Sequence, residues 1–243
     1  MSKVGNRIFT KIERADRELV EQFRGLPSSN INDEMNRLFN MNANITLMNP
    51  EKAKHMVGTA FTVHAPIGDN LFLHYALDLA QPGDVIVVDG GGYANRAFAG
   101  EIMMTFAQDK GIAGVVVDGC MRDSDGMKNL TMPVYSVGVT PQGPYKNGPG
   151  EINTAVSCGG QVVFPGDILV GDADGIVVIH KQDAAEVLEA AKKKKKAGED
   201  RTFELMDSDL ETYAKKHEAS TEQRADGKGI AFINEVYTKA YEL

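Results

Sequence analysis

The chain has 243 residues, of which 42% are hydrophobic and 25% are charged, and these proportions are typical of a soluble globular protein. A chain of this length buries enough surface to fold without a disulfide framework or a structural metal. Its formal net charge is −8, which argues against nucleic acid as the main partner, because phosphate binding needs a cationic face.

Cysteine usage and hydropathy indicate the compartment. The two cysteines, Cys120 and Cys158, are too few for a metal cage and do not indicate a disulfide framework. The N-terminal residues lack the apolar core of a signal peptide, and no apolar run approaches membrane-spanning length. These features predict a reducing, cytoplasmic compartment and no membrane partner.

The first half of the chain alternates helical patterns with runs that are typical of strands. Helices are expected over residues 13–23, 28–38 and 71–80, over the stretch that ends at Lys110-Gly111, and in a short piece that ends near Asn129. Strands are expected over residues 57–64, 85–89, 115–118 and 133–137. Because strands and helices alternate from residue 85 to residue 137, we predict an α/β fold with parallel strands and right-handed crossovers.

The second half has a different pattern. Residues 141–150 are rich in Pro and Gly and are expected to form a long loop. Three short runs, 161–164, 167–170 and 175–179, are separated by tight turns and predict an antiparallel meander. A helix is expected over 182–196, followed by a polar stretch. We therefore predict an α/β domain over residues 1–198 with N-terminal helices, and a C-terminal helical arm over 199–243 that contacts a neighbouring subunit.

Two loops follow strands that are expected to be neighbours in the sheet. Gly90-Gly91-Gly92 leads to Gly100-Glu101 at the start of one helix, and Gly119 leads to Arg122-Asp123 at the start of another. Parallel sheets place ligands at the carboxyl ends of their strands. These two loops are therefore the strongest candidate for a functional site.

The residue types at this place suit an anionic ligand and a metal. Arg122 can hold a carboxylate through two hydrogen bonds, and Asp123 can ligate a hard divalent cation. Free N–H groups at the start of the first helix, those of Ile102, Met103 and Met104, can bind an anion such as the carboxylate of a 2-oxo acid. The alternative is that Arg122 and Asp123 form only an ion pair at the start of a helix.

The spacing of these residues resembles a known motif. Glu101 precedes Arg122-Asp123 by twenty intervening residues, which resembles the motif of the 4-hydroxy-4-methyl-2-oxoglutarate aldolase family. These enzymes are class II, metal-dependent pyruvate aldolases, and they share a fold with the regulator of ribonuclease activity A. The resemblance covers about residues 57–190 and includes Gly68-Asp69-Asn70, Pro82-Gly83-Asp84 and Pro165-Gly166-Asp167. The family often has Asp at the position of Glu101, so this residue is a conservative departure.

The resemblance implies a role for each matching residue. Asp123 resembles the ligand of Mg²⁺ or Mn²⁺, and Arg122 resembles the residue that binds the 2-oxo acid and stabilises its enolate oxygen. Glu101 resembles the carboxylate that orients a water for proton exchange. Glu199 resembles an acidic residue that a neighbouring subunit supplies, although it could equally be a plain surface residue. The backbone of Gly100, Ile102, Met103 and Met104 resembles the part of the family's site that binds the substrate carboxylate.

The resemblance also implies a fold, an assembly and a reaction. The fold is a three-layer β/β/α arrangement like the swivelling domains, and the assembly is a trimer or hexamer with the active site between subunits. The reaction is the retro-aldol cleavage of 4-hydroxy-4-methyl-2-oxoglutarate or 4-carboxy-4-hydroxy-2-oxoadipate to pyruvate and a second oxo acid, with oxaloacetate decarboxylation as a related activity. The alternative is a non-catalytic regulator of ribonuclease that binds another protein, but the regulators have a non-acidic residue at the position of Asp123.

Three further features have two interpretations each. His74 could line the pocket or pack within its helix. Cys120 lies near Arg122 in sequence, but no His pairs with it, so packing is the preferred interpretation. The run Lys192–Lys196 is either a solvated helix end or a surface that draws anionic substrates or faces acidic residues of another subunit.

Overall fold

The computed structural model describes residues 3–225 and residue 228. The chain divides into two compact units, Met1–Lys195 and Lys196–Leu243. The first unit contains a sheet whose strands run in the order β1-β7-β3-β4-β5-β6-β2, with β10 pairing with β3 and β11 pairing with β10. Its strands are β1 (Asn6–Ile8), β2 (Thr46–Leu47), β3 (Met56–His64), β4 (Asp84–Ala97), β5 (Gly114–Met121), β6 (Val134–Val139), β7 (Gly150–Ile152), β10 (Ile168–Asp172) and β11 (Gly175–Ile179).

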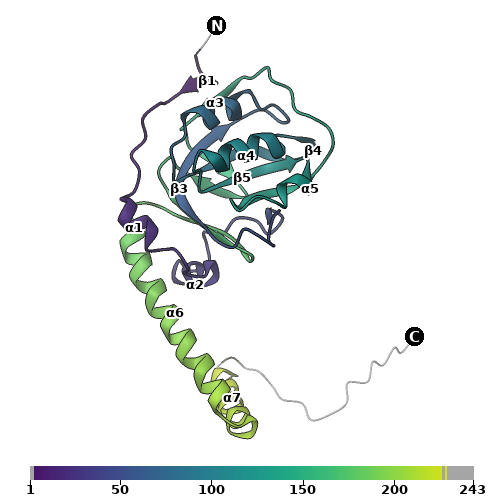
Figure 1. Cartoon of the computed structure of the whole chain (residues 1–243). Coiled ribbons are helices and arrows are strands. Elements are labelled where there is room, and N and C mark those ends of the chain that lie inside the picture. Colours follow the sequence, from purple (N-terminus) through teal and green to yellow (C-terminus); the bar gives the residue numbers. More distant parts are fainter. Residues whose placement is uncertain (1–2, 226–227, 229–243) are drawn as a thin grey trace, which may run out of the picture. The chain divides into compact units, whose positions relative to one another are not determined.

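The predicted α/β fold is confirmed at the centre of this sheet. Strands β3, β4, β5 and β6 lie side by side and pair in parallel. The helices that connect them are α3 (Leu71–Leu79), α4 (Glu101–Asp109) and α5 (Ser124–Met127). Figure 1 shows α3 and α4 lying over one face of β3, β4 and β5, as right-handed crossovers require.

Apolar side chains fill both faces of the central sheet. On the side of α3 and α4, the buried cluster includes Ile86 and Val88 of β4 with Leu73 and Met104 of the helices. On the other side, Val85 and Val87 join a second cluster with β8 (Val156–Cys158) and β9 (Gln161–Val163). Alternate residues of β4 thus point to opposite buried layers, which explains the continuous apolar run of this strand. Each such side chain contributes about 1.5–3 kcal/mol when it is fully buried.

The remaining helices of the first unit pack on β10 and β11. They are α1 (Arg17–Glu21), α2 (Ser28–Glu34) and the first part of α6 (Ala184–Asp207), and they share a buried cluster with Ile168 and Val177. Helix α6 continues into the second unit, which also contains α7 (Leu210–Ala225). In the described part of the chain, no helix is both long and apolar enough to cross a membrane.

The glycine triplet is one correction to the sequence-based expectation. Gly90, Gly91 and Gly92 lie inside β4 rather than in a loop. Gly91 and Gly92 have φ angles of 66° and 70°, and the pairing of β4 with β5 continues beyond them with register shifts. A side chain at Gly90 would come within 2.6 Å of the Asp118 carbonyl oxygen. The triplet therefore serves close backbone approach within an irregular strand.

The predicted meander is wrong in part. Strands β10 and β11 form the expected antiparallel hairpin, but β9 pairs with β8 in a separate sheet. β10 instead pairs with β3 on its other side. The backbone of Gly166 and Asp167 explains this, because both residues bond to Ala60 of β3 and direct the chain to the central sheet.

Helix lengths also differ from the prediction. α1 begins only at Arg17, because the Asp16 side chain accepts a hydrogen bond from the Leu19 N–H and caps the helix there. α6 extends past the predicted end at residue 196 to Asp207, since the lysines of this run are good helix formers.

Two Pro-Gly-Asp turns lead into strands. The turn of residues 82–84 ends at the first residue of β4, and the turn of residues 165–167 directly precedes β10. In each, the Asp carboxylate accepts a hydrogen bond from the backbone N–H three residues earlier, at 2.8 Å for Asp84 and 2.9 Å for Asp167. Asp84 also binds the Arg14 guanidinium through two bonds of 2.8 and 2.7 Å. Asp167 instead pairs with His180 Nδ1 at 2.8 Å. Both carboxylates are buried, so these turns anchor the strand starts to distant segments.

Candidate active site

The Arg122-Asp123 pair lies just beyond the end of β5. The Arg122 N–H donates to the Ala99 carbonyl at 3.0 Å and so joins this point to the start of α4. Asp123 has φ 58° and ψ 41° and precedes α5 as its N-cap residue. This left-handed conformation is uncommon outside Gly, although Asp tolerates it better than most residues. The sharp turn ends β5 and sets the direction of the Asp123 side chain.

Gly100 brings α4 and Asp123 together. Gly100 is the N-cap residue of α4, and Glu101 is the first residue of the helix, as predicted. A side chain at Gly100 would collide with Asp123 Oδ2 and would lie 3.0 Å from Arg122 Cγ. The absence of a Cβ therefore lets the Asp123 carboxylate lie against the backbone at the N-terminus of α4, where the helix dipole favours negative charge.

The ion pair between Arg122 and Asp123, which the sequence left as the alternative to ligand binding, is present. Arg122 Nε lies 3.4 Å from Asp123 Oδ2, and both side chains are 45% exposed. An ion pair this long and this exposed contributes little to stability. Both groups therefore remain available to a ligand.

Glu101 lies beside α5. A side chain at Gly126 of α5 would collide with the Glu101 carboxylate, so this glycine makes room for it. Gly100 and Gly126 thus allow Glu101, Arg122 and Asp123 to lie at the adjoining N-termini of α4 and α5.

The start of α4 leaves fewer donors than predicted. The Met104 N–H is not free, because it donates to the Gly100 carbonyl at 3.2 Å as the first hydrogen bond of the helix. Within the described residues, no backbone hydrogen bond occupies the N–H groups of Ile102 and Met103. These two amides are the anion-binding donors that the geometry offers.

Arg122 and Asp123 lie between two hollows of the surface. One, of about 590 Å³, extends over α5 towards Val139 and Pro141. The other, of about 310 Å³, brings Gly100, Met103, Arg122 and Asp123 together with Asn70, His74 and Lys146. The second hollow is the candidate active-site cavity, because it contains the predicted anion donors and the predicted metal ligand.

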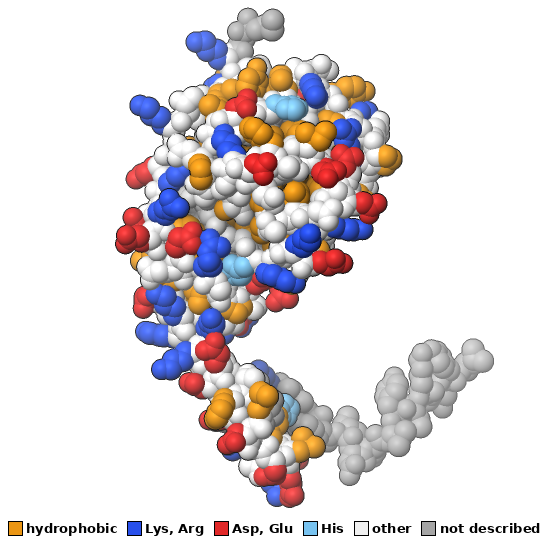
Figure 2. Space-filling view, in the orientation of Figure 1, with side chains coloured by type: hydrophobic (Ala, Val, Ile, Leu, Met, Phe, Trp, Pro, Cys, Tyr) orange, Lys and Arg blue, Asp and Glu red, His pale blue; other side chains and the backbone are white. Residues whose placement is uncertain are grey.

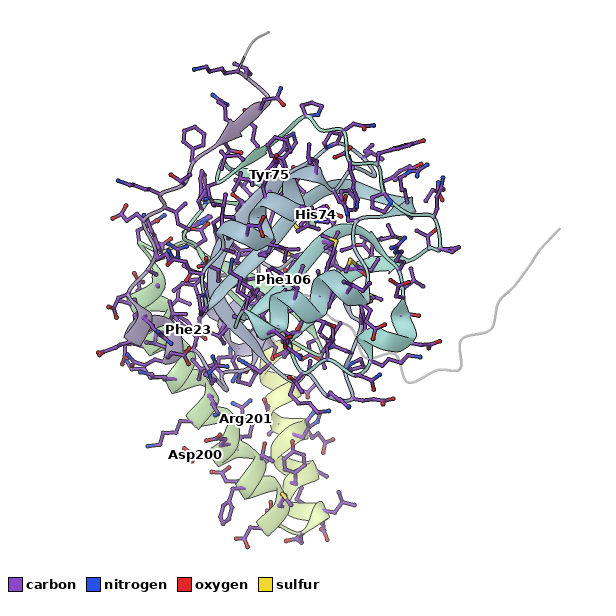
Figure 3. The ribbon with its side chains drawn as sticks, turned by 45° about the horizontal axis from the view of Figure 1, so that its top comes forward. Phe23, His74, Tyr75, Phe106, Asp200 and Arg201 are labelled. Carbon is purple, nitrogen blue, oxygen red and sulfur yellow. The ribbon has the colours of Figure 1, made fainter. Side chains whose placement is uncertain are left out.

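Three residues of this cavity were not among the predicted site residues. The sequence left two interpretations of His74 open and did not predict Asn70 or Lys146 as site residues. Asn70 and His74 come from α3 and the turn before it, and Figure 3 shows His74 beside Tyr75 on this helix, with Phe106 on α4. Lys146 comes from the Pro- and Gly-rich segment after β6. The signal that could have found Lys146 is its position in a loop that follows the carboxyl end of a parallel strand.

Titratable groups near the site have clear physical environments. Burial, together with repulsion from Lys146, lowers the pKa of His74. Burial raises the pKa of the Cys120 thiol, which donates to the Ala94 carbonyl at 3.1 Å. Cys120 is therefore a packed thiol and not a thiolate nucleophile.

The donor set fits a hard cation that takes few protein ligands. In the part of the chain that the structure describes, no three His, Cys, Asp or Glu side chains are placed to hold a metal ion together. Mg²⁺ commonly binds through one or two carboxylates and keeps several waters. The half-exposed carboxylate of Asp123 fits that mode, whereas zinc requires three or four protein ligands, a group that the described residues do not form.

Glu199 belongs to the second unit, on the exposed surface of α6. Its role as the acidic residue of a neighbouring subunit stays a prediction.

The chain matches known proteins over most of its length. The family model described as Aldolase/RraA, or RraA-like, matches residues 28–178. The chain belongs to this family. A relative from Halalkalibacterium halodurans, named "Putative 4-hydroxy-4-methyl-2-oxoglutarate aldolase", is 41% identical over 81% of this chain and 93% of its own.

Solved structures of RraA-like proteins share the fold. An uncharacterised protein from Pseudomonas syringae pv. tomato superposes with a TM-score of 0.71 and 28% identity, over 83% of this chain and 98% of its own. RraAS2 of Streptomyces coelicolor, described as an unusual member of the RNase ES inhibitor RraA family, has a TM-score of 0.70 and 27% identity, over 79% of this chain and all of its own. The α/β fold with a central sheet and flanking helices is therefore the RraA-like fold.

Proposed function

We propose that this protein is a divalent-metal-dependent lyase that cleaves 4-hydroxy-4-methyl-2-oxoglutarate or 4-carboxy-4-hydroxy-2-oxoadipate to pyruvate and a second oxo acid. The observation that carries the proposal is the position of Arg122 and Asp123 in one cavity with the open N-terminus of α4. The name of the relative from Halalkalibacterium halodurans supports an aldolase-type reaction.

The residues of this chain divide the work of binding and proton transfer. The N–H groups of Ile102 and Met103 bind the carboxylate of the 2-oxo acid. The Arg122 guanidinium lies at the same cavity and stabilises the negative charge that develops on the 2-oxo oxygen during cleavage. Glu101 holds or orients the proton carrier, since its carboxylate lies on the adjoining helix start.

Asp123 is the residue that would hold Mg²⁺ or Mn²⁺. When bound, the cation supplies Lewis-acid polarisation of the 2-oxo group, so that no lysine Schiff base is needed. Oxaloacetate decarboxylation uses the same binding groups, because loss of CO₂ from oxaloacetate also develops negative charge on the oxygen beside Arg122.

A second candidate is a regulator that binds a ribonuclease, because RraA-type inhibitors have the same fold. The feature that favours the enzyme is Asp123. Its carboxylate, held in a left-handed turn against Gly100, is the group that metal binding requires and that docking to another protein does not require.

Pyruvate release tests the proposal. Wild-type protein should release pyruvate from 4-hydroxy-4-methyl-2-oxoglutarate with Mg²⁺ or Mn²⁺, and excess EDTA should abolish the release. Asp123→Asn should lower the rate by about 10²-fold or more, because the ligand charge and the transition-state stabilisation that depends on it are lost.

The matched control is Asp125→Asn. Asp125 lies two residues away, is 96% exposed and pairs with Lys128 at 2.9 Å, so its loss should leave the rate unchanged. The same rate in Asp123→Asn as in wild type would contradict the proposed role. Absence of turnover with each metal, for this substrate and for oxaloacetate, would favour the binding role.

The proposed assembly is a homo-oligomer, a trimer or a hexamer, with the active site between subunits. Exposed apolar side chains on the outer side of α3 and α4 support it, and Figure 2 shows hydrophobic groups at the surface of this face. Tyr75 is 46% exposed, Phe106 is 50% exposed and Ile102 is 83% exposed. Ile102 lies at the cavity itself, so a second copy that covers it would also border the site.

Truncation after residue 198 tests the contribution of the arm. We expect loss of pyruvate release, because Glu199 and the rest of the arm are proposed to complete the site of a neighbouring subunit. Sedimentation velocity would report the oligomeric state, and Glu199→Gln in the full chain would separate the carboxylate from the rest of the arm. A truncated protein that stays a fully active oligomer would overturn the proposal for the arm.

A further inference from the structure

The outer wall of the active-site cavity is formed by the segment of residues 142–147, which hydrogen bonds fix at several points. Gln142 accepts a hydrogen bond from the Ala97 N–H at 2.8 Å. Arg96 donates to the Gly143 carbonyl at 2.6 Å and stacks on the Tyr145 ring at 4.1 Å. Both contacts come from the end of β4. The first part of the segment is therefore tied to the same sheet that carries the site.

The turn before α3 fixes the second part of the segment. The Tyr145 N–H donates to the Gly68 carbonyl at 2.9 Å, and the Tyr145 carbonyl accepts from the Asn70 N–H at 3.0 Å. The Asn147 N–H donates to Asp69 Oδ2 at 2.6 Å. Lys146 lies between these two fixed residues, so its backbone position at the cavity is set on both sides.

The Lys146 ammonium has no fixed partner in the part of the chain that the structure describes. No ion pair or side-chain hydrogen bond involves Lys146 there, although this residue lines the cavity. Its charge acts on α3, because repulsion from Lys146 contributes to the lowered pKa of His74. An unpaired cation held at a cavity wall is a binding group for an anion.

Two polar groups of the same cavity are also unsatisfied. Asn70 is 1% exposed, and its Oδ1 finds no hydrogen-bond donor in the described part of the chain. His74 Nε2 is likewise buried without a partner among those residues. Native proteins leave few buried polar atoms unpaired, so this wall indicates a polar ligand. The cavity volume of about 310 Å³ lies at the small end of the range for small-molecule sites.

We propose that Lys146 forms a second anion subsite, which binds the distal carboxylate of the substrate and selects 2-oxo dicarboxylic and tricarboxylic acids over 2-oxo monocarboxylic acids. This inference rests on the proposed function, in which the amides of α4 and Arg122 bind the 2-oxo acid end. Gly143 places the two cations on one wall, since a side chain there would lie 2.9 Å from Arg122 Nη1. Arg122 and Lys146 thus face the two charged ends of one ligand.

Calorimetric titration with two unreactive ligands tests the subsite. 2-Oxoglutarate and 2-oxopentanoate have the same chain length, differ in the distal carboxylate, and lack the 4-hydroxyl that retro-aldol cleavage requires. With Mg²⁺ present, the wild-type protein should bind 2-oxoglutarate about tenfold more tightly, the gain expected of one charge-assisted contact. Lys146→Met should remove this preference without weakening 2-oxopentanoate, and Lys146→Arg should retain it.

The matched control is Lys52→Met, because Lys52 is an exposed lysine outside the cavity and its loss changes the net charge equally. Turnover adds a second readout, since Lys146→Met should raise KM for 4-carboxy-4-hydroxy-2-oxoadipate more than it lowers kcat. Equal binding of both ligands to the wild type, or a preference that survives in Lys146→Met, would overturn the subsite while pyruvate release remains. A Lys146-dependent preference without pyruvate release would support the subsite and overturn the lyase. No binding of either ligand would overturn the subsite, and it would overturn the lyase as well only if pyruvate release is also absent.

Discussion

Asp84 lies at the start of β4 and Asp123 lies just after the end of β5, so the two carboxylates lie at opposite ends of the parallel strands. The side of the sheet where these strands begin is called here the amino edge, and the side where they end is called the carboxyl edge. The Asp84 side chain is 1% exposed and accepts two hydrogen bonds from Arg14 and one from the Gln81 N–H. The Asp123 side chain is 45% exposed, and the distance of its ion pair with Arg122 is 3.4 Å. The first carboxylate is satisfied by the protein, whereas the second has capacity left for a ligand.

This difference shows how the two edges of the sheet divide stability and chemistry. At the amino edge, buried charges are fully paired, which is the condition for their burial. At the carboxyl edge, Gly100 and Gly126 leave room for the carboxylates of Asp123 and Glu101, and the pair that Asp123 makes with Arg122 is long and half-exposed. Substitutions at the two edges should therefore have separable effects.

The largest expected effect on stability is that of Asp84→Asn. It leaves the Arg14 guanidinium, 28% exposed, without its charged partner, and breaking such a pair costs about 3 kcal/mol. Denaturant unfolding should show the lower free energy, while pyruvate release per folded molecule should stay near the wild-type value. The control is Glu13→Gln, which alters an exposed ion pair with Lys181 and should leave the denaturant concentration at the unfolding midpoint unchanged. Equal stability of Asp84→Asn and wild type would remove the distinction between the edges.

Gly100→Ala should act on the other edge. The backbone of Gly100 has φ −144°, which any residue adopts, but the new Cβ would displace the Asp123 carboxylate. Misplacement of a reacting group by about 1 Å can cost about 10²-fold in rate, so pyruvate release should fall by up to that factor. The melting temperature should change little, because the Asp123 side chain can move towards solvent.

The matched control for that substitution is Gly138→Ala, since a Cβ at Gly138 of β6 would meet Cys120 Sγ at 3.5 Å, an ordinary contact distance. It should keep the wild-type rate. A large loss of stability in Gly100→Ala would show that the carboxyl edge also supports the fold.

A smaller effect is expected from His74, which lies at the site but is partly enclosed. In the folded state the pKa of His74 is lowered below the ordinary value of an imidazole. Burial is the larger cause, and repulsion from Lys146 is the second. As the pH falls through that ordinary value, the unfolded chain takes up a proton that the folded imidazole resists, so stability decreases towards acid. His74→Asn should lessen the difference in unfolding free energy between about pH 7 and about pH 5. An unchanged difference would show that His74 does not contribute to this pH dependence.

The sequence predicted the features that local patterns determine. Continuous apolar runs and intervening helices predicted the parallel strands β3 to β6, and strand ends predicted that Gly100-Glu101 and Arg122-Asp123 would lie together. It did not predict that Gly90 to Gly92 remain in β4 or that β9 pairs with β8, because these depend on contacts between distant segments. Lys146 was missed for the same reason, since its place at the cavity follows from bonds to Gly68, Asp69 and Arg96.

The left-handed backbone of Asp123 has a consequence for how this position can vary. Only a few residues accept that conformation easily, chiefly Gly, Asn and Asp, and of these only Asp carries a charge. Drift among the tolerated residues therefore removes the carboxylate while the turn between β5 and α5 is retained. A single replacement at this position would therefore separate the proposed chemistry from the architecture, so that the reaction is lost while the folded surface is kept.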